Sequence, residues 1–182
     1  MYDRPLASPA PSSKPQKIRL VSVGYPSDAA TRFEINSDDQ LTYAGQGPMY
    51  ARSDAKSPGL YIVTMSSEGH VNARRHFETN RDLNQVAALN QFLDSLEPGS
   101  LIFMIAGNGA FAKTTKKTSK LLSEMGARMI LNVTPSASYL LIARKGDALG
   151  PVYEQVDPAG RPISITLGPS DIRAILAPPS RQ

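Results

Sequence analysis

One segment constrains the fold more than any other, because residues Leu101–Ala106 are all apolar. Pro98-Gly99 precedes this run and Gly107-Asn108-Gly109 follows it, so turn-forming residues bound it on both sides. A short, bounded apolar run is typical of a central β-strand covered on both faces. It is also too short to cross a bilayer, so we expect no transmembrane segment and no membrane insertion.

Further strands are predicted on either side of this run, where residues that favour strands lie between turn signals. They are expected over Lys17–Val23, Arg32–Asn36, Leu41–Ala44, Leu60–Met65, His70–Glu78, Arg128–Val133, Tyr139–Arg144, Pro151–Gln155 and Ile163–Leu167. The two segments at 60–65 and 70–78 are separated by a short turn, which favours a hairpin. The chain therefore reads as one compact domain that mixes strands with helices.

Three helices are predicted, two between these strands and one after the last of them. Apolar residues at three- and four-residue spacing place the first over Arg81–Leu96 and the second over Lys113–Met125. Asn80 is the expected N-cap of the first helix, and Gly126 the expected C-terminal cap of the second. A short third helix is expected over Ser170–Leu176, with its first serine as the cap.

The N-terminal segment differs in composition from the rest of the chain. Residues 1–16 contain four prolines and three serines and cannot pack a core. We expect an arm over 1–16 that contacts a protein partner, a domain over 17–155, and a C-terminal extension over 156–182 with a short strand and helix. No apolar leader follows Met1, so no signal peptide is predicted and the compartment stays open between a virion and a cell-surface assembly.

The residue inventory argues against most catalytic chemistry. The chain has no cysteine, which excludes disulfides, thiolate nucleophiles and cysteine-ligated metals. His70 and His76 are the only histidines and are too few to close a zinc site. The net charge of +4 is modest, and no aromatic run accompanies the lysines, so nucleic acid is not an expected partner. We expect a protein that is not an enzyme and carries no cofactor or metal.

Two motifs have both a possible binding role and a purely structural explanation. Residues 107–114, Gly-Asn-Gly-Ala-Phe-Ala-Lys-Thr, follow a strand and open a helix as a phosphate-binding loop does, although Ala112 stands where that loop needs glycine. The alternatives are a degenerate nucleotide site and a glycine-rich turn. Lys113 and Lys117, with Lys116 and Lys120, form a basic stripe that is either a solvated face or an anion site.

The order of several short motifs resembles the interleukin-like EMT inducer domain, also called the GG domain. The motifs are Gly59-Leu60-Tyr61-Ile62-Val63, Glu68-Gly69-His70-Val71, Arg75-His76-Phe77-Glu78-Thr79, Pro98-Gly99-Ser100-Leu101-Ile102-Phe103, Met125-Gly126 and Ala143-Arg144-Lys145-Gly146. The resemblance extends over roughly residues 17–155. It implies an α+β fold in which two packed, mostly antiparallel β-sheets are flanked by two main helices.

The same resemblance implies recognition without catalysis. The family includes secreted cytokine-like proteins and the sugar-binding stem domain of protein O-mannose N-acetylglucosaminyltransferase. Asn108 and Ser136 stand near the positions where that stem domain holds its sugar with charged groups, and Tyr139 replaces a tryptophan. With the stripe residues Lys113 and Lys117, these are the expected ligand-binding residues for a glycan or an anion.

These observations lead to a ranked set of functional hypotheses. The first is a non-enzymatic recognition or structural module, a component of a larger assembly such as a phage virion, anchored by its arm and facing a cell-surface glycan. The second is a free-standing carbohydrate-binding module. The third is a nucleotide-binding protein that uses residues 107–114.

Overall fold

A computed structural model of the protein describes residues 17–24, 32–37, 40–43, 59–107, 109–130, 133–146 and 152–177. Its elements are β1 Lys17–Ser22, β2 Arg32–Ser37, β3 Gln40–Tyr43, β4 Leu60–Met65, β5 Val71–Phe77, α1 Leu83–Asp94, β6 Leu101–Ala106, α2 Lys116–Glu124, β7 Ser138–Arg144, β8 Tyr153–Asp157, β9 Ile163–Leu167 and α3 Pro169–Leu176. The strands form two antiparallel sheets, ordered β3-β2-β1-β9 and β5-β4-β6-β7-β8. This confirms the predicted α+β fold of two packed sheets.

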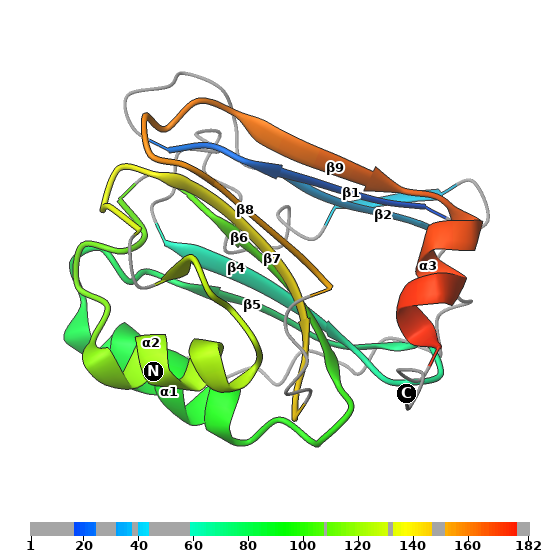
Figure 1. Ribbon diagram of the computed structural model, residues 1–182, viewed down its shortest axis with the longest axis horizontal. Helices are drawn as coiled ribbons and strands as arrows, with labels where there is room; N and C mark the ends of the chain where they lie inside the picture. Colours follow the sequence, from blue (N-terminus) through cyan, green and yellow to red (C-terminus); the bar gives the residue numbers. More distant parts are fainter. Residues whose placement is uncertain are drawn as a thin grey trace, which may run out of the picture.

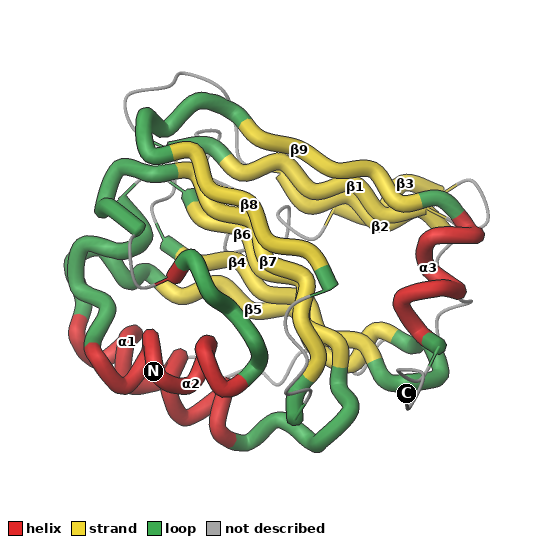
Figure 2. The backbone as a smooth tube through the Cα atoms, viewed as in Figure 1, coloured by secondary structure: helices red, strands yellow, loops and turns green. Residues whose placement is uncertain are grey.

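The five-stranded sheet forms the middle layer of the molecule. Helices α1 and α2 lie on one of its faces, and the four-stranded sheet lies on the other (Figures 1 and 2). Within β6, Ile102 and Met104 pack toward the helices, whereas Phe103 and Ile105 pack toward the second sheet. All six residues of β6 are buried, so the prediction of a central strand covered on both faces is confirmed.

The C-terminal strand completes the second sheet. β9 pairs antiparallel with β1, and Ile163 and Leu167 join Ile18 and Leu20 in the core between the sheets. Helix α3 follows β9 directly and adds Ile172 to that core. The strand and helix predicted for residues 156–182 are therefore present, and they form part of the sandwich.

One predicted strand is wrong. Residues Arg128–Val133 were expected to form a strand, yet the described residues 128–130 and 133 belong to none. The backbone N–H groups of Arg128 and Met129 donate instead to the carboxylate of Glu154 on β8, at 2.8 and 3.0 Å. These N–H groups are therefore paired with a side chain, and not with the carbonyls of a neighbouring strand.

The helix starts also differ from their predicted caps. α1 begins after Asp82, whose carboxylate accepts from the Asn84 N–H at 2.8 Å, and not after Asn80. α3 begins after Gly168, whose N–H donates to the Asp171 carboxylate at 2.8 Å. Proline at the first helical position, Pro169, accounts for this earlier start, because its fixed φ suits a helix and its missing N–H needs no partner.

α2 is shorter than predicted and starts three residues later. Thr115 is its N-cap. The Thr115 hydroxyl accepts from the Thr118 N–H, and the Thr118 hydroxyl accepts from the Thr115 N–H, which makes a capping box. At the other end Gly126 has φ of 91°, the left-handed conformation expected of a C-terminal cap. Lys113 therefore lies outside the helix, in the turn before it.

Two consecutive basic residues tie helices to opposite faces of the middle sheet. Side chains alternate between faces where a strand ends, so Arg144 and Lys145 point in opposite directions. Arg144 donates to the carbonyls of Ile175 and Ala177 at the end of α3, the second at 3.2 Å. Lys145 Nζ donates to the Leu93 carbonyl of α1 at 2.9 Å. Cations are favoured at helix C-termini. Arg144 and Lys145 therefore hold α3 and α1, respectively, to the C-terminal end of β7.

Candidate functional site

The loop resembling a phosphate-binding loop is fastened to the core. Ala110 and Phe111 are buried, and the hydroxyl of Thr79 donates to the Ala110 carbonyl. The N–H groups of Ala110 and Ala112 donate to the carbonyls of Gly107 and Gly109, at 3.1 and 3.0 Å. A phosphate loop must present such N–H groups to its ligand. These two are already used, so the segment is better explained as a turn, while Asn108 lies outside the described residues.

The two lysines of the predicted site are exposed. Lys117 projects from α2 and Lys113 from the turn that precedes it. In the described part of the chain, the ion pair on this surface joins Lys120 to Glu124 at 3.8 Å and leaves both site lysines unpaired with acids. Both site lysines are thus accessible to an anion.

Tyr139 belongs to the core and not to the surface. Its side chain is 0% exposed, and its ring lies edge-on to Phe111 with 5.4 Å between ring centroids. Its hydroxyl donates to the Glu154 carboxylate at 2.6 Å, the same carboxylate that holds the N–H groups of residues 128 and 129. In this arrangement the ring cannot stack on a surface ligand. The half-buried Ser136 lies three residues earlier, in the connection before β7.

Replacement of Tyr139 by phenylalanine tests this network through its pH dependence. Burial, followed by the hydrogen bond and the negative charge of Glu154, raises the pKa of Tyr139 above its ordinary value of 10.0. A group whose folded pKa is raised contributes stability below its unfolded pKa, and this contribution is lost as the pH rises above it. We expect the variant to be about 1–2 kcal/mol less stable at pH 7.

The measurement is urea unfolding of both proteins from pH 7 to pH 11. Above pH 10 the difference in unfolding free energy between wild type and Tyr139→Phe should shrink by about 1.4 kcal/mol per pH unit. A difference that stays constant across this range would show that the Tyr139 hydroxyl ionises as freely in the folded protein as in the unfolded chain.

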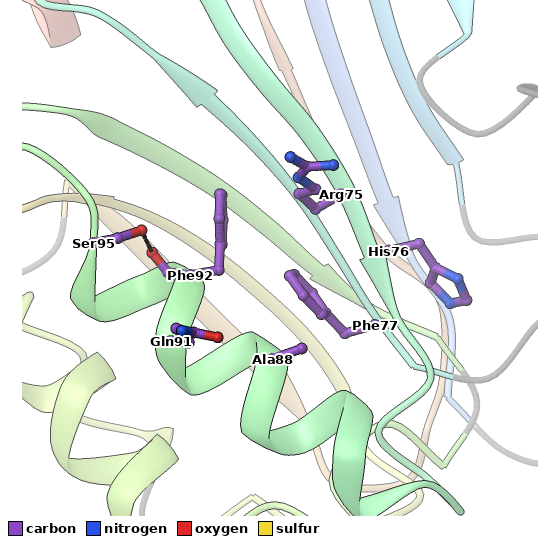
Figure 3. Close-up of a pocket in the computed structure, with 7 residues that line it drawn as sticks. All are labelled: Arg75, His76, Phe77, Ala88, Gln91, Phe92 and Ser95. Atoms are coloured by element: carbon purple, nitrogen blue, oxygen red, sulfur yellow. Dashed lines mark hydrogen bonds between the residues drawn. The ribbon is translucent and has the colours of Figure 1, made fainter. Parts of the chain in front are cut away.

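A groove of about 400 Å³ lies between strand β5 and helix α1 (Figure 3). Its lining consists of Arg75, His76 and Phe77 from the strand, Ala88, Gln91 and Phe92 from the helix, and Ser95 after it. The rings of Phe77 and Phe92 form its floor, 5.6 Å apart between centroids and tilted by 40°. The groove therefore combines an aromatic floor with polar groups along its rim.

Packing holds each wall of the groove in place. Phe77 is buried in the core beneath α1, and Phe92 packs against the same cluster. His76 stacks on Tyr61 of β4 with 4.3 Å between the ring centroids. The Ser95 hydroxyl donates to the Phe92 carbonyl at 2.9 Å and finishes the helix. By contrast, no hydrogen bond or ion pair among the described residues engages the side chains of Arg75 and Gln91.

A second hollow of about 350 Å³ lies where β8, β9 and α3 meet. Its lining is largely apolar, and two of its three polar side chains, Asp171 and Tyr153, already have partners. Asp171 accepts from the Gly168 N–H, and the Tyr153 hydroxyl donates to the Gln155 side chain. This hollow therefore offers fewer groups for recognition than the β5–α1 groove.

Comparison with known proteins identifies the segment that carries the groove. Residues 58–147 match the family of the interleukin-like EMT inducer. No curated protein matches the chain. The matched segment is narrower than the resemblance predicted over 17–155, and it contains β4, β5, α1, β6, α2 and β7. All seven groove residues lie within the matched segment, whereas the four-stranded sheet, β8 and α3 lie outside it.

The prediction from sequence missed the groove, although part of its signal was present. Ala88, Gln91, Phe92 and Ser95 recur at helical spacing beside the core-facing stripe of α1. Two of these four residues, Ala88 and Phe92, are apolar, so this second face of the helix is only partly apolar. Nothing in the helix itself tells that the face stands beside an edge strand, since this follows from the sheet order.

Among the helices that the structure describes, none has both the length and the apolar character needed to cross a bilayer.

Proposed function

We propose that the protein is a non-enzymatic recognition module whose binding surface is the β5–α1 groove. The observation that carries this proposal is the groove itself, an open hollow with an aromatic floor inside the family-matched segment. Two of its polar side chains, Arg75 and Gln91, make no hydrogen bond or ion pair among the described residues. Binding sites generally combine an apolar surface with a few placed polar groups that fix orientation. The β5–α1 groove has this composition.

The groove residues can offer a ligand both apolar contact and hydrogen bonds. The half-buried Phe92, with the small exposed part of Phe77, offers apolar surface, so an apolar group placed there is removed from water, which is favourable. Gln91 can both donate and accept hydrogen bonds, and Arg75 adds a planar, permanently charged donor. Because both polar chains lie at the rim, they can pair with a ligand without first breaking contacts within the described residues.

Filling the groove should abolish ligand binding without unfolding the protein. Ala88 and Ala87 are both exposed on α1, but only Ala88 lines the groove. We expect Ala88→Phe to block ligands selected from glycan and peptide arrays, with at least about tenfold weaker binding. Ala87→Phe adds the same side chain one position along the helix and should leave binding within about twofold.

The readout is titration of each array-selected ligand against the three proteins, with thermal unfolding to confirm that all are folded. If the selected ligands bind wild type and Ala88→Phe equally well, recognition takes place elsewhere on the molecule. If the arrays yield no ligand for the wild type, the proposal of a recognition module loses its support.

A glycan site at the residues predicted from sequence remains a separate prediction. With Tyr139 in the core, such a site would depend on the exposed Lys113 and Lys117 together with Ser136 and Asn108. A double Lys113→Ala, Lys117→Ala variant on the same glycan array tests it, because loss of a glycan signal that Ala88→Phe retains would place the glycan there. The proposed anchoring of a larger assembly, such as a virion, by residues 1–16 also stays a prediction, since the arm lies outside the described residues.

A further inference from the structure

Strand β5 forms one edge of the middle sheet. In the described part of the chain it pairs with β4 on one side and has no strand on the other. Gly107 N–H donates to the Gly59 carbonyl at 2.8 Å, in register with the pairing of β4 and β6. Hydrogen-bonding direction alternates along an antiparallel strand, so Ile62 points toward β5, where its partner is Arg75. The backbone groups of Arg74 must then point away from β4, toward the outer edge.

The groove continues around this edge. Arg75 and His76 are neighbours on β5, so their side chains leave the sheet on opposite faces, and yet both line the groove. In Figure 3 the His76 ring projects away from α1, whereas Phe77 lies between the strand and the helix. A ligand seated in the groove would therefore pass along the edge of β5 and reach its backbone.

Two arginines give this edge positive charge. Arg74 and Arg75 are exposed, and neither makes an ion pair with a described acid. Burial of part of its side chain lowers the pKa of Arg74, so its charged form would gain from a nearby carboxylate. Arginines on an edge strand also discourage pairing with a second copy, because a β5–β5 pair would place like charges near one another.

We propose that β5 accepts an extended, acidic segment of a partner protein as an added antiparallel strand. Opposite Phe77 the segment carries an apolar side chain, and opposite Arg75 and Arg74 it carries two consecutive acidic residues. Because the added strand runs antiparallel to β5, its sequence from the N- to the C-terminus is an apolar residue, any residue, and then two acidic residues. Strand addition beside a helix is an established mode of peptide recognition, in which the backbone supplies affinity and alternate side chains supply selectivity.

The side chains of such a segment alternate as the groove requires. The apolar residue and the first acid face α1, where they meet the aromatic floor and Arg75. The second acid points to the opposite face, where it meets Arg74. Antiparallel addition also continues the arrangement of every strand pair in the two sheets.

This inference rests on the proposed function, and a synthetic peptide tests it. The probe is an acetylated octapeptide with Phe-Thr-Glu-Glu at its centre and Ser or Thr elsewhere, titrated into the full chain. We expect Arg75→Glu to weaken binding by about tenfold. Replacing the first peptide Glu by Lys should restore it on that variant. Arg81→Glu, an equal charge change at an exposed position outside the groove, should alter binding by less than about twofold.

Two N-methylated peptides separate strand addition from other binding in the groove. The N–H of the second Glu should donate to the Arg74 carbonyl, so its methylation should abolish binding. The N–H of the first Glu should point away from β5, so its methylation should leave most of the affinity. Hydrogen exchange of the Arg74 amide should slow when the unmethylated peptide binds.

Each outcome decides between the two proposals. If the peptide binds in an Ala88-dependent way but both methylations act alike, strand addition is wrong and the recognition module stands. A glycan that binds wild type but not Ala88→Phe, with no binding by the peptide, likewise overturns strand addition alone. If neither class of ligand depends on Ala88, both proposals fail.

Discussion

Replacing Arg144 with methionine is expected to lower the free energy of unfolding by about 3 kcal/mol, because three charged hydrogen bonds to partly buried carbonyls are lost together. The Arg144 side chain is 9% exposed and donates to the carbonyls of Gly99, Ile175 and Ala177. Among the described residues its partners are carbonyls and not carboxylates. Methionine keeps much of the volume but leaves the end of α3 without its donors, so the helix should detach more readily from β7.

Two matched variants separate the local effect from a general loss of charge. Lys145→Met removes the neighbouring cation, whose single bond to the Leu93 carbonyl serves α1, and should cost about 1 kcal/mol. Urea unfolding gives both values. Hydrogen exchange should quicken in α3 for Arg144→Met and at the end of α1 for Lys145→Met. Equal costs for the two variants, or unchanged exchange in α3, would contradict the proposed role of Arg144.

Strands that are buried on both faces are among the segments predicted best from sequence. Leu101–Ala106 and Leu60–Met65 were predicted with the boundaries that the structure has, because both are buried on both faces and bounded by turns. Arg128–Val133 failed for the opposite reason. Its strand-like composition is local, but its backbone is held by Glu154, about two dozen residues further along the chain, through the described contacts at 128 and 129. Local pattern carries no sign of such a partner.

The site residues were predicted from their positions along the sequence, and these positions do not show which side chains are buried. Tyr139 carries a polar group and an aromatic ring, which suits a ligand contact as well as a core position. Only the partners across the fold decide between them, and here Phe111 and Glu154 surround it. The groove was missed for a related reason. Phe77 and Phe92 come from different elements and meet only because β5 is the edge strand beneath α1.

Gly24 lies where the backbone after β1 closely approaches the connections at Ser136 and Gly160, and Gly24→Ala is expected to cost at least about 3 kcal/mol. A Cβ there would lie 2.1 Å from the Ser136 carbonyl oxygen and 2.7 Å from Gly160 Cα, both backbone atoms that cannot rotate away. The Gly24 N–H also donates to the Ser138 hydroxyl at 2.7 Å, so any shift disturbs β7 as well.

Gly99→Ala is the matched control for this substitution. Gly99 has φ of 87°, so alanine is strained there, but no atom lies within 4 Å of its added Cβ, and the cost should be about 1 kcal/mol. Urea unfolding of the two variants therefore separates steric overlap from backbone strain. Because the overlap at Gly24 is with the connection that carries Ser136, Gly24→Ala should also alter the chemical shifts of residues 133–138, while Gly99→Ala leaves them unchanged. Similar costs for the two variants would mean that the two connections can part without loss, and that the close approach at Gly24 does not hold the sheets together.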